Sequence, residues 1–285
     1  MSAADSLSHY LQALEDSLSA EIAVAFRDLE SGQEFFFNEK IEMHAASTMK
    51  VAVMIEVFRQ VEAGRFRLED SLSVANSFNS IVDGSPYSLD IGEDSDDAIY
   101  AAIGSKMSIR QLTHNMITVS SNLATNLLIG LVGAANVMET LEQLEISNLK
   151  VLRGVEDIKA YRLGMNNTTN AIDLMRCLLA IAENRAASAN SCRAMIEILQ
   201  AQTFREKIPA RLPGGWMVGN KTGSITGIEH DCALIFPPGR KPCAMAILTR
   251  GIATADHANT AIAEIAARLG HTFIGLNRPV SSKTN

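Results

Sequence analysis

The sequence predicts an α+β fold, in which a five-stranded antiparallel sheet with flanking terminal helices adjoins an all-helical domain. Segments with strand character lie near the two ends of the chain, within residues 21–37 and 216–250, and the long stretch between them has mainly helical periodicity. Short strands at both ends of a chain most simply join in one sheet, with the helices segregated around it. We therefore expect a sheet domain from residues 1–46 and 202–285, a helical domain from residues 47–201, and a site at their interface.

The first elements follow from periodicity and turn residues. Residues 4–20 predict an amphipathic helix, because leucines recur on one stripe. Residues 21–26 and 33–37 predict two strands of a hairpin, since Asp and Gly occur in the turn between them. The run at residues 51–58 is apolar nearly all round, which indicates a helix buried in the core. Gly64 marks the end of that helix.

The remaining elements are more helices, one long loop and three further strands. We expect helices at residues 108–118, 121–131 and 190–201, and a further helix that begins near residue 134. Another helix should begin after a cap at Thr168-Thr169 and end near residue 183. The last helix is expected at residues 256–269, with Gly270 as the stop. Residues 145–167 predict a long loop, and such loops in compact domains are often functional. We expect strands at residues 216–222, 229–236 and 243–250.

Composition excludes several classes of protein. The chain has 285 residues, of which 47% are hydrophobic and 20% charged, and this is typical of a globular protein. Its net charge of -7, without a basic stripe, argues against nucleic acid as a partner. The longest apolar runs are shorter than a membrane span. Residues 1–5 lead into a polar helix instead of the apolar run of a signal peptide, so we expect a cytosolic chain or a mature N-terminus.

Cysteine, histidine and acidic residues give no metal-binding pattern. The four cysteines, Cys177, Cys192, Cys232 and Cys243, have no metal-ligand spacing. Cys232 and Cys243 are candidates for a disulfide, although we expect buried free thiols at all four positions. His44 and His230 are expected to be structural or surface residues. The acidic run at residues 93–97 is expected to be a solvated loop. We expect neither a metal nor an organic cofactor.

Three short polar motifs stand out, each at the edge of a predicted element. They are Ser47-Thr48-Met49-Lys50, Ser120-Ser121-Asn122 and Lys221-Thr222-Gly223. Ser47 and Lys50 share one helical face, and a desolvated lysine amine is able to take the proton of a serine hydroxyl. Taken alone, the first motif is more often a helix cap with a surface lysine. The three motifs together favour a catalytic serine.

The three motifs, in this order, resemble those of class A β-lactamases and penicillin-binding proteins. The resemblance extends to residues 120–128, to the loop at residues 153–169, and to Leu212-Pro213-x-Gly215-Trp216 before the last motif. It implies the β-lactamase/transpeptidase-like fold and the following roles. Ser47 would be the nucleophile, Lys50 its base, and Ser120 the donor to the leaving nitrogen, whereas Asn122, Lys221, Thr222, Gly223 and Ser224 would bind substrate. The backbone N–H groups of Ser47 and Ser224 would form an oxyanion hole.

Class A β-lactamases also need a glutamate on the long loop to release the acyl group. In the family this glutamate stands two residues after an arginine. Here Val155 stands two residues after Arg153, and Glu156 follows it. We take Glu156 as the candidate base; the alternative is a loop carboxylate that pairs with Arg153.

Two other positions depart from the family. Ser121 replaces an acid in the second motif, and Asn167 replaces the aspartate before the Thr168-Thr169 pair.

The resemblance implies a serine β-lactamase that hydrolyses a small β-lactam through an acyl-enzyme on Ser47. A penicillin-binding D,D-peptidase or esterase with slow deacylation is an alternative, as is a β-lactam-binding sensor without turnover. A glutaminase is a more distant alternative, and the Lys221-Thr222-Gly223 motif argues against it. We expect a monomer in the periplasm or outside the cell, because β-lactams act outside the inner membrane. Tyr87 and Tyr100 are expected to pack near the pocket.

Overall fold

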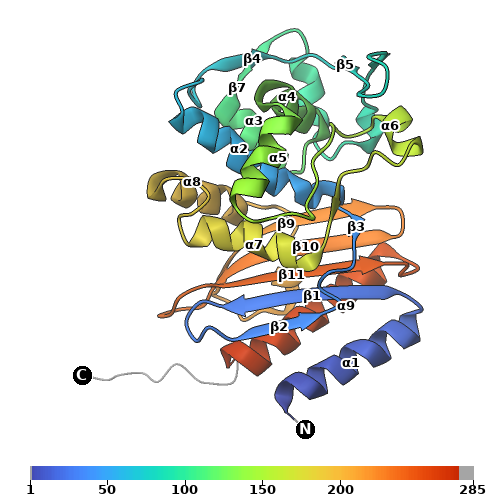
Figure 1. Ribbon diagram of the computed structural model, residues 1–285, viewed down its shortest axis with the longest axis vertical. Coiled ribbons are helices and arrows are strands. Elements are labelled where there is room, and N and C mark those ends of the chain that lie inside the picture. Colours follow the sequence, from blue (N-terminus) through green and yellow to red (C-terminus); the bar gives the residue numbers. More distant parts are fainter. Residues whose placement is uncertain (1, 276–285) are drawn as a thin grey trace.

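The computed structural model describes residues 2–275, and its core is one five-stranded antiparallel sheet (Figure 1). The strand order is β2-β1-β11-β10-β9, and every neighbouring pair is antiparallel. The strands are β1 (Glu21–Asp28), β2 (Glu34–Phe37), β9 (Met217–Ile225), β10 (Ile228–Phe236) and β11 (Cys243–Arg250). Strands from both ends of the chain therefore join in one sheet, which confirms the predicted fold class. Residues 1 and 276–285, which the predicted sheet domain includes, lie outside the described residues.

The two faces of the sheet belong to different hydrophobic clusters. Helices α1 (Ala3–Leu18) and α9 (Ala255–Leu269) cover one face, where Cys243 contributes to the cluster. Cys232 lies in the cluster on the opposite face. Because successive side chains of a strand alternate between faces, these two cysteines cannot pair. All four cysteines are buried free thiols, as expected from the sequence.

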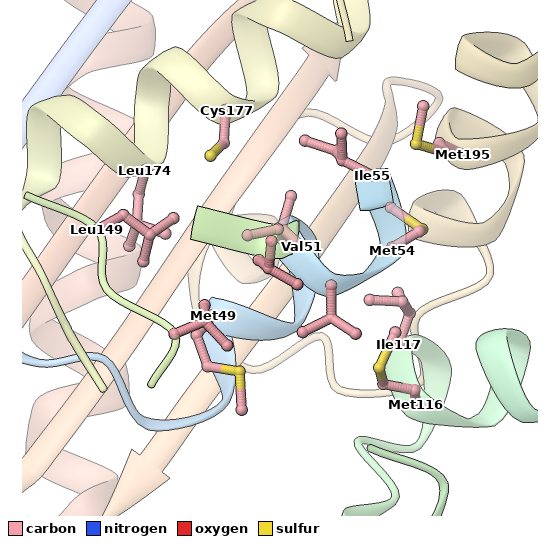
Figure 2. Close-up of a cluster of buried hydrophobic side chains, with 14 of the residues drawn as sticks. Met49, Val51, Met54, Ile55, Met116, Ile117, Leu149, Leu174, Cys177 and Met195 are labelled. Carbon is pink, nitrogen blue, oxygen red and sulfur yellow. The ribbon is translucent and has the colours of Figure 1, made fainter. Parts of the chain in front are cut away.

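Helix α2 (Lys50–Glu62) runs through the centre of the helical part, and ten of its thirteen residues are buried. The other helices are α3 (Ile109–Thr118), α4 (Asn122–Val132), α5 (Ala134–Gln143), α6 (Ile158–Arg162), α7 (Ala171–Ala182) and α8 (Ala189–Gln200). Figure 2 shows Val51 and Ile55 of α2 surrounded by side chains that include Met116 of α3, Cys177 of α7 and Met195 of α8. The same cluster includes sheet residues, so the helices and the sheet share one core. The boundaries between a sheet domain and a helical domain stay a prediction.

Short elements connect the helical part. The two-residue strands β3 (Met43–His44) and β8 (Thr168–Thr169) pair with each other, as do β4 (Ser71–Ser73) with β7 (Lys106–Ser108) and β5 (Phe78–Asn79) with β6 (Pro86–Tyr87). Short 3-10 helices are η1 (Ala46–Met49), η2 (Ile91–Glu93), η3 (Asp97–Ala102) and η4 (Ile208–Arg211). The β3–β8 pair fixes the chain directly before η1, which contains Ser47.

Three expectations about element boundaries were wrong. Thr168-Thr169 is not a helix cap, because the pair forms β8 and Asn170 caps α7 by accepting the N–H of Asp173. The predicted long loop contains α6. Strand β9 continues to Ile225, so the Lys221-Thr222-Gly223 motif lies inside the strand and not at its end. The last α-helix ends at Leu269 with Gly270 as its C-cap, as expected, and the chain continues from Gly270 as one π-helical turn to Ile274.

No single helix among residues 2–275 is long and apolar enough to cross a membrane. Helices α4 and α5, bent by 78° relative to each other, together have the necessary length and composition.

Candidate active site

The turn η1 presents Ser47 at the junction of the sheet and α2. Ser47 is half-buried, and the backbone N–H of Lys50 donates to its carbonyl. The preceding residue, Ala46, has a left-handed conformation (φ 45°), and its N–H donates to Nδ1 of His44 at 3.0 Å. Strand β9 touches this turn through Gly223, where an added Cβ would lie 3.1 Å from the Ser47 nitrogen. A side chain at this position would crowd the turn, so glycine favours the close approach of the strand to the serine.

Lys50 is completely buried and surrounded by oxygen acceptors. Its Nζ donates to the Ser120 carbonyl at 2.7 Å and to Oδ1 of Asn122 at 2.9 Å, and it lies 3.2 Å from Oγ of Ser120. Burial lowers the pKa of Lys50 to about 7, although the charges of Asp94 and Glu156 act in the opposite direction. A neutral amine has two N–H groups for the two carbonyl oxygens and keeps one lone pair. This lone pair makes Lys50 able to accept a proton.

The hydroxyl of Ser120 lies between two lysine amines. Lys221, which is also completely buried, donates to Oγ of Ser120 at 2.9 Å and to the Thr222 carbonyl at 2.8 Å. Burial, together with the positive charge of Lys50, holds the pKa of Lys221 well below its ordinary value. The structure therefore brings together Lys50, Ser120 and Lys221 beside the turn that carries Ser47.

Three residues at this site have left-handed backbones although none is glycine. Ala46, Ser120 and Glu156 have φ values of 45°, 57° and 62°. Such conformations cost about 1 kcal/mol or more each and persist where the surroundings fix them. Their presence here indicates that local backbone strain positions the polar side chains.

The N-terminus of α4 is held by an acidic side chain from a distant part of the sequence. Asp94 accepts the N–H groups of Asn122 and Leu123 at 2.9 Å, while Ser121 caps the same helix with its hydroxyl. Ser121 itself carries no carboxylate, and Asp94 supplies one to this helix N-terminus. The expectation of a purely solvated acidic loop was wrong, because Asp96 is also buried.

Glu156 reaches the site through Asn122. Its Oε1 accepts from Nδ2 of Asn122 at 3.2 Å, and its Oε2 accepts the N–H of Asp90 at 2.9 Å. Partial burial raises the pKa of Glu156, and the negative charges of Asp94 and Glu93 add to this effect. A carboxylate with a raised pKa is a better proton acceptor from water.

The backbone next to Glu156 is fixed by a buried amide. Oδ1 of Asn126 accepts the N–H of Val155 at 2.7 Å, and its Nδ2 donates to the Val155 carbonyl at 3.0 Å. Gly154 makes this possible, because an added Cβ would lie 2.5 Å from Oδ1 of Asn126. Val155 is thus held at the position two residues after Arg153. The next residue, Glu156, has a left-handed backbone conformation, and this directs its own side chain to Asn122.

Arg153 interacts with neutral groups of its own loop. Its guanidinium donates to the carbonyls of Met165 and Gly154 and to Oδ1 of Asn166. Asn167 accepts the N–H of Arg153 and donates back to its carbonyl at 3.0 Å. An amide thus closes the loop where the family has an aspartate.

A third buried lysine, Lys207, lies at the end of the site and was not predicted from the sequence. Nζ of Lys207 lies 2.6 Å from Oε2 of Glu229, and donates to Oγ of Ser224 at 3.0 Å and to the His230 carbonyl at 3.2 Å. Lys207 lies outside any motif, so its sequence context gave no signal. Glu229 faces Ser224 across the β9–β10 pair, which the pairing of two correctly bounded strands would have revealed.

The two singled-out histidines have different roles. His230 is completely buried, accepts the N–H of Thr249 at Nδ1, and donates from Nε2 to the His44 carbonyl. Burial lowers the pKa of His230 to about 4, so this residue is structural, as expected. His44 accepts the N–H of Ala46 and so supports the turn η1 that carries Ser47.

The two tyrosines lie at the edge of the site. Tyr100 donates to Asp94 at 3.1 Å, and the Tyr87 hydroxyl lies 3.4 Å from the Val155 carbonyl. In the described part of the chain, no group of three or more His, Cys, Asp or Glu side chains is arranged to hold a metal ion.

Comparisons with known proteins agree with this geometry. The sequence model of the beta-lactamase enzyme family matches residues 6–273. A carbapenem-hydrolyzing beta-lactamase KPC from Klebsiella oxytoca is 25% identical over 93% of this chain and 87% of its own length. A beta-lactamase from Bacillus subtilis is 27% identical, covering 89% of this chain and 79% of the relative. The crystal structure of a beta-lactamase from Sphaerobacter thermophilus superposes with a TM-score of 0.81 at 25% identity, over 93% of this chain and 95% of that one. The chain belongs to the beta-lactamase enzyme family.

Proposed function

We propose that the chain is a serine β-lactamase that opens the lactam amide through an acyl-enzyme on Ser47. The observation that carries the proposal is the Ser120 hydroxyl, which lies 2.9 Å from one buried lysine amine and 3.2 Å from another. A general acid for a leaving nitrogen needs a proton relay of this kind. The raised pKa of Glu156 supports the hydrolytic half of the reaction.

In the acylation step, Oγ of Ser47 attacks the lactam carbonyl while neutral Lys50 takes its proton. The backbone N–H groups of Ser47 and Ser224 stabilise the oxyanion, and each such donor contributes about 3 kcal/mol in comparable sites. The C–N bond then breaks, and the nitrogen receives a proton from the Ser120 hydroxyl. Lys50 returns its proton to Ser120, so the acyl-enzyme forms without net proton change.

In the deacylation step, Glu156 takes a proton from a water that attacks the ester carbonyl. Collapse of the second tetrahedral intermediate breaks the bond to Oγ of Ser47, which regains the proton that Glu156 took from the water, so the enzyme returns to its starting state. Asn122 links the two steps, because it donates to Glu156 at 3.2 Å and accepts from Lys50 at 2.9 Å. We assign Asn122 the role of hydrogen-bonding the amide side chain of the substrate.

We infer that the carboxylate of the substrate binds along β9, the edge strand of the sheet. Thr222 and Ser224 are two residues apart and share one face of the strand, with Gly223 between them, and Lys221 directly precedes Thr222. Gly223 leaves room for the ligand along this edge. Lys207, which donates to Ser224, is a second cation at this end of the site.

The test is turnover of nitrocefin by the purified protein and by three variants. Ser47→Ala and Lys50→Ala are expected to lose acylation, and Glu156→Gln is expected to acylate but to accumulate the acyl-enzyme, detectable by intact mass. Matched controls are Ser147→Ala and Lys106→Ala, two exposed positions far from the motifs in sequence, which should keep wild-type rates. Wild-type turnover in Ser47→Ala would refute the proposal. Unchanged hydrolysis in Glu156→Gln would refute only the choice of deacylation base.

The alternatives differ in the fate of the acyl group. A D,D-peptidase or esterase would give a stoichiometric burst followed by slow release, and a sensor would give the burst without release. Steady hydrolysis after the burst supports the β-lactamase. We further propose a monomer acting outside the inner membrane, where β-lactams reach their targets, with no nucleic acid, membrane or cofactor partner.

A further inference from the structure

We propose that Glu229 is a specificity-determining residue that competes, as an internal counterion, with the carboxylate of the substrate for Lys207. The inference rests on the proposed function for the identity of the substrate. It adds a substrate preference: the wild-type site discriminates weakly between β-lactams with a free carboxylate and their uncharged esters.

The competing groups lie on one face of the β9–β10 pair. Glu229 stands opposite Ser224, and Asp231 stands opposite Thr222. Residues directly opposite each other in an antiparallel pair share a face. The two hydroxyls assigned to substrate binding therefore have an internal carboxylate as their nearest cross-strand neighbour.

Glu229 already occupies the contacts that an incoming carboxylate would use. Its Oε2 lies 2.6 Å from Nζ of Lys207, and the hydroxyl of Ser224 donates to the same oxygen. The side chain of Lys207 is 1% exposed, so this ion pair is little screened by solvent. A substrate carboxylate at Ser224 would have to share the lysine with a neighbouring negative charge.

A cavity next to Ser224 and Glu229 leaves space for a ligand group beside the Lys207–Glu229 ion pair. Ser224 and Glu229 both line a cavity of about 290 Å³, whose other walls include Ile252 and Ala255 at the start of α9. The side chain of Glu229 is 12% exposed, which places the carboxylate at the boundary between the buried lysine and the cavity. A ligand group that extends beyond Ser224 therefore meets Glu229 first.

Loss of the Glu229 charge should strengthen the binding of anions. In Glu229→Gln, Lys207 keeps neutral partners in Ser224 and the His230 carbonyl but loses its ion-pair partner, while the buried Asp231, whose pKa the charge of Lys207 lowers, remains nearby. An entering substrate carboxylate can then pair with Lys207 and is no longer repelled by the charge of Glu229. Removal of one like charge next to a partly buried anion is enough for a change of about tenfold in affinity.

The experiment compares nitrocefin with its methyl ester, which differ only in the carboxylate. For Glu229→Gln we expect KM for the acid to fall about tenfold with little change for the ester, whereas Glu229→Asp should behave like the wild type. Glu264→Gln is the matched control, because it removes a half-buried glutamate that pairs with Arg211 on another part of the protein. Thermal unfolding of each variant verifies that it is folded.

A second measurement does not depend on β-lactam chemistry. Inorganic sulfate is titrated into the substrate-free proteins, and its dissociation constant is read from the rise in melting temperature. We expect sulfate to bind Glu229→Gln about tenfold more tightly than the wild type. Equal sulfate affinity, or equal loss of activity toward acid and ester, overturns the inference and assigns Glu229 a purely structural role. Absence of β-lactam turnover in the wild type would refute the proposed function, while the sulfate titration would still decide the role of Glu229.

Discussion

The lowered pKa of Lys50 predicts that acylation is limited by pH in an accessible range. With a pKa of about 7, this amine is about half neutral at pH 7 and about one-tenth neutral at pH 6. If only the neutral amine accepts the proton of Ser47, acylation at pH 6 is about fivefold slower than at pH 7. From pH 7 to pH 8 it rises less than about twofold. A lysine with its ordinary pKa would instead give about a tenfold rise per pH unit throughout this range.

Glu156→Gln provides the perturbation that tests this assignment. The charge of Glu156 raises the pKa of Lys50 against the effect of burial, so its removal should lower that pKa further. The midpoint of the acylation profile then moves to lower pH, while the substitution stalls deacylation and makes acylation directly visible.

The assay is stopped-flow acylation in single-turnover conditions between pH 5 and pH 9. Lys106→Ala, which changes an exposed lysine, should keep the wild-type midpoint. Acylation that is equally fast at pH 6 and pH 8, or a midpoint that moves to higher pH in Glu156→Gln, would show that neutral Lys50 is not the base.

Two further predictions concern buried groups. His230 has a folded pKa of about 4, below its ordinary 6.5, so its contribution to stability is present above pH 6.5 and is lost as pH falls toward 4, by up to about 3 kcal/mol. The pKa of Asp231 is raised from 3.8 to about 6, so its contribution to stability increases as pH falls over nearly the same range and offsets part of the loss caused by His230. In Asp231→Asn, the free energy of unfolding in urea should therefore show the full loss due to His230 between pH 6.5 and pH 4. Equal free energies of unfolding at the two pH values in that variant would contradict the assignment. Gly154→Ala places a methyl group against Asn126 and should free both backbone groups of Val155, lowering stability by about 2 kcal/mol and lengthening the lifetime of the acyl-enzyme. Melting temperature and intact mass measure these two effects, and no change in either would mean that Asn126 does not hold the loop.

The sheet, the buried helix and the three motifs were predictable because each depends on local pattern. The apolar run from Val51 predicts a helix without a solvent face, and α2 is buried on all sides. Strand patterns at both ends of the chain predict a shared sheet, which the structure contains. The roles assigned to the site residues stay predictions, although the structure brings Lys50, Ser120 and Lys221 within hydrogen-bonding distance.

The remaining features depend on contacts between residues far apart in sequence. The acidic run has the composition of a solvated loop, yet Asp94 caps a helix that begins 28 residues later at Asn122. Lys207 and Glu229 become partners only when η4 packs under the β9–β10 pair. Composition and periodicity contain no information about such pairings. Glu156 was a candidate by proximity in sequence alone, since its access to Asn122 depends on one left-handed backbone conformation.

The three buried lysines differ in the charged groups around them, and this difference explains why substrate binding should change the pKa of one of them. Lys50 is influenced by the carboxylates of Asp94 and Glu156, and Lys207 pairs with Glu229. Lys221 instead donates to two uncharged oxygens, and burial with two neighbouring lysines depresses its pKa. An anionic substrate at Thr222 would raise that pKa, because a nearby negative charge favours the protonated amine. In the proposed mechanism, substrate binding would thereby favour a positive charge next to the Ser120 hydroxyl, the proposed proton donor to the leaving nitrogen.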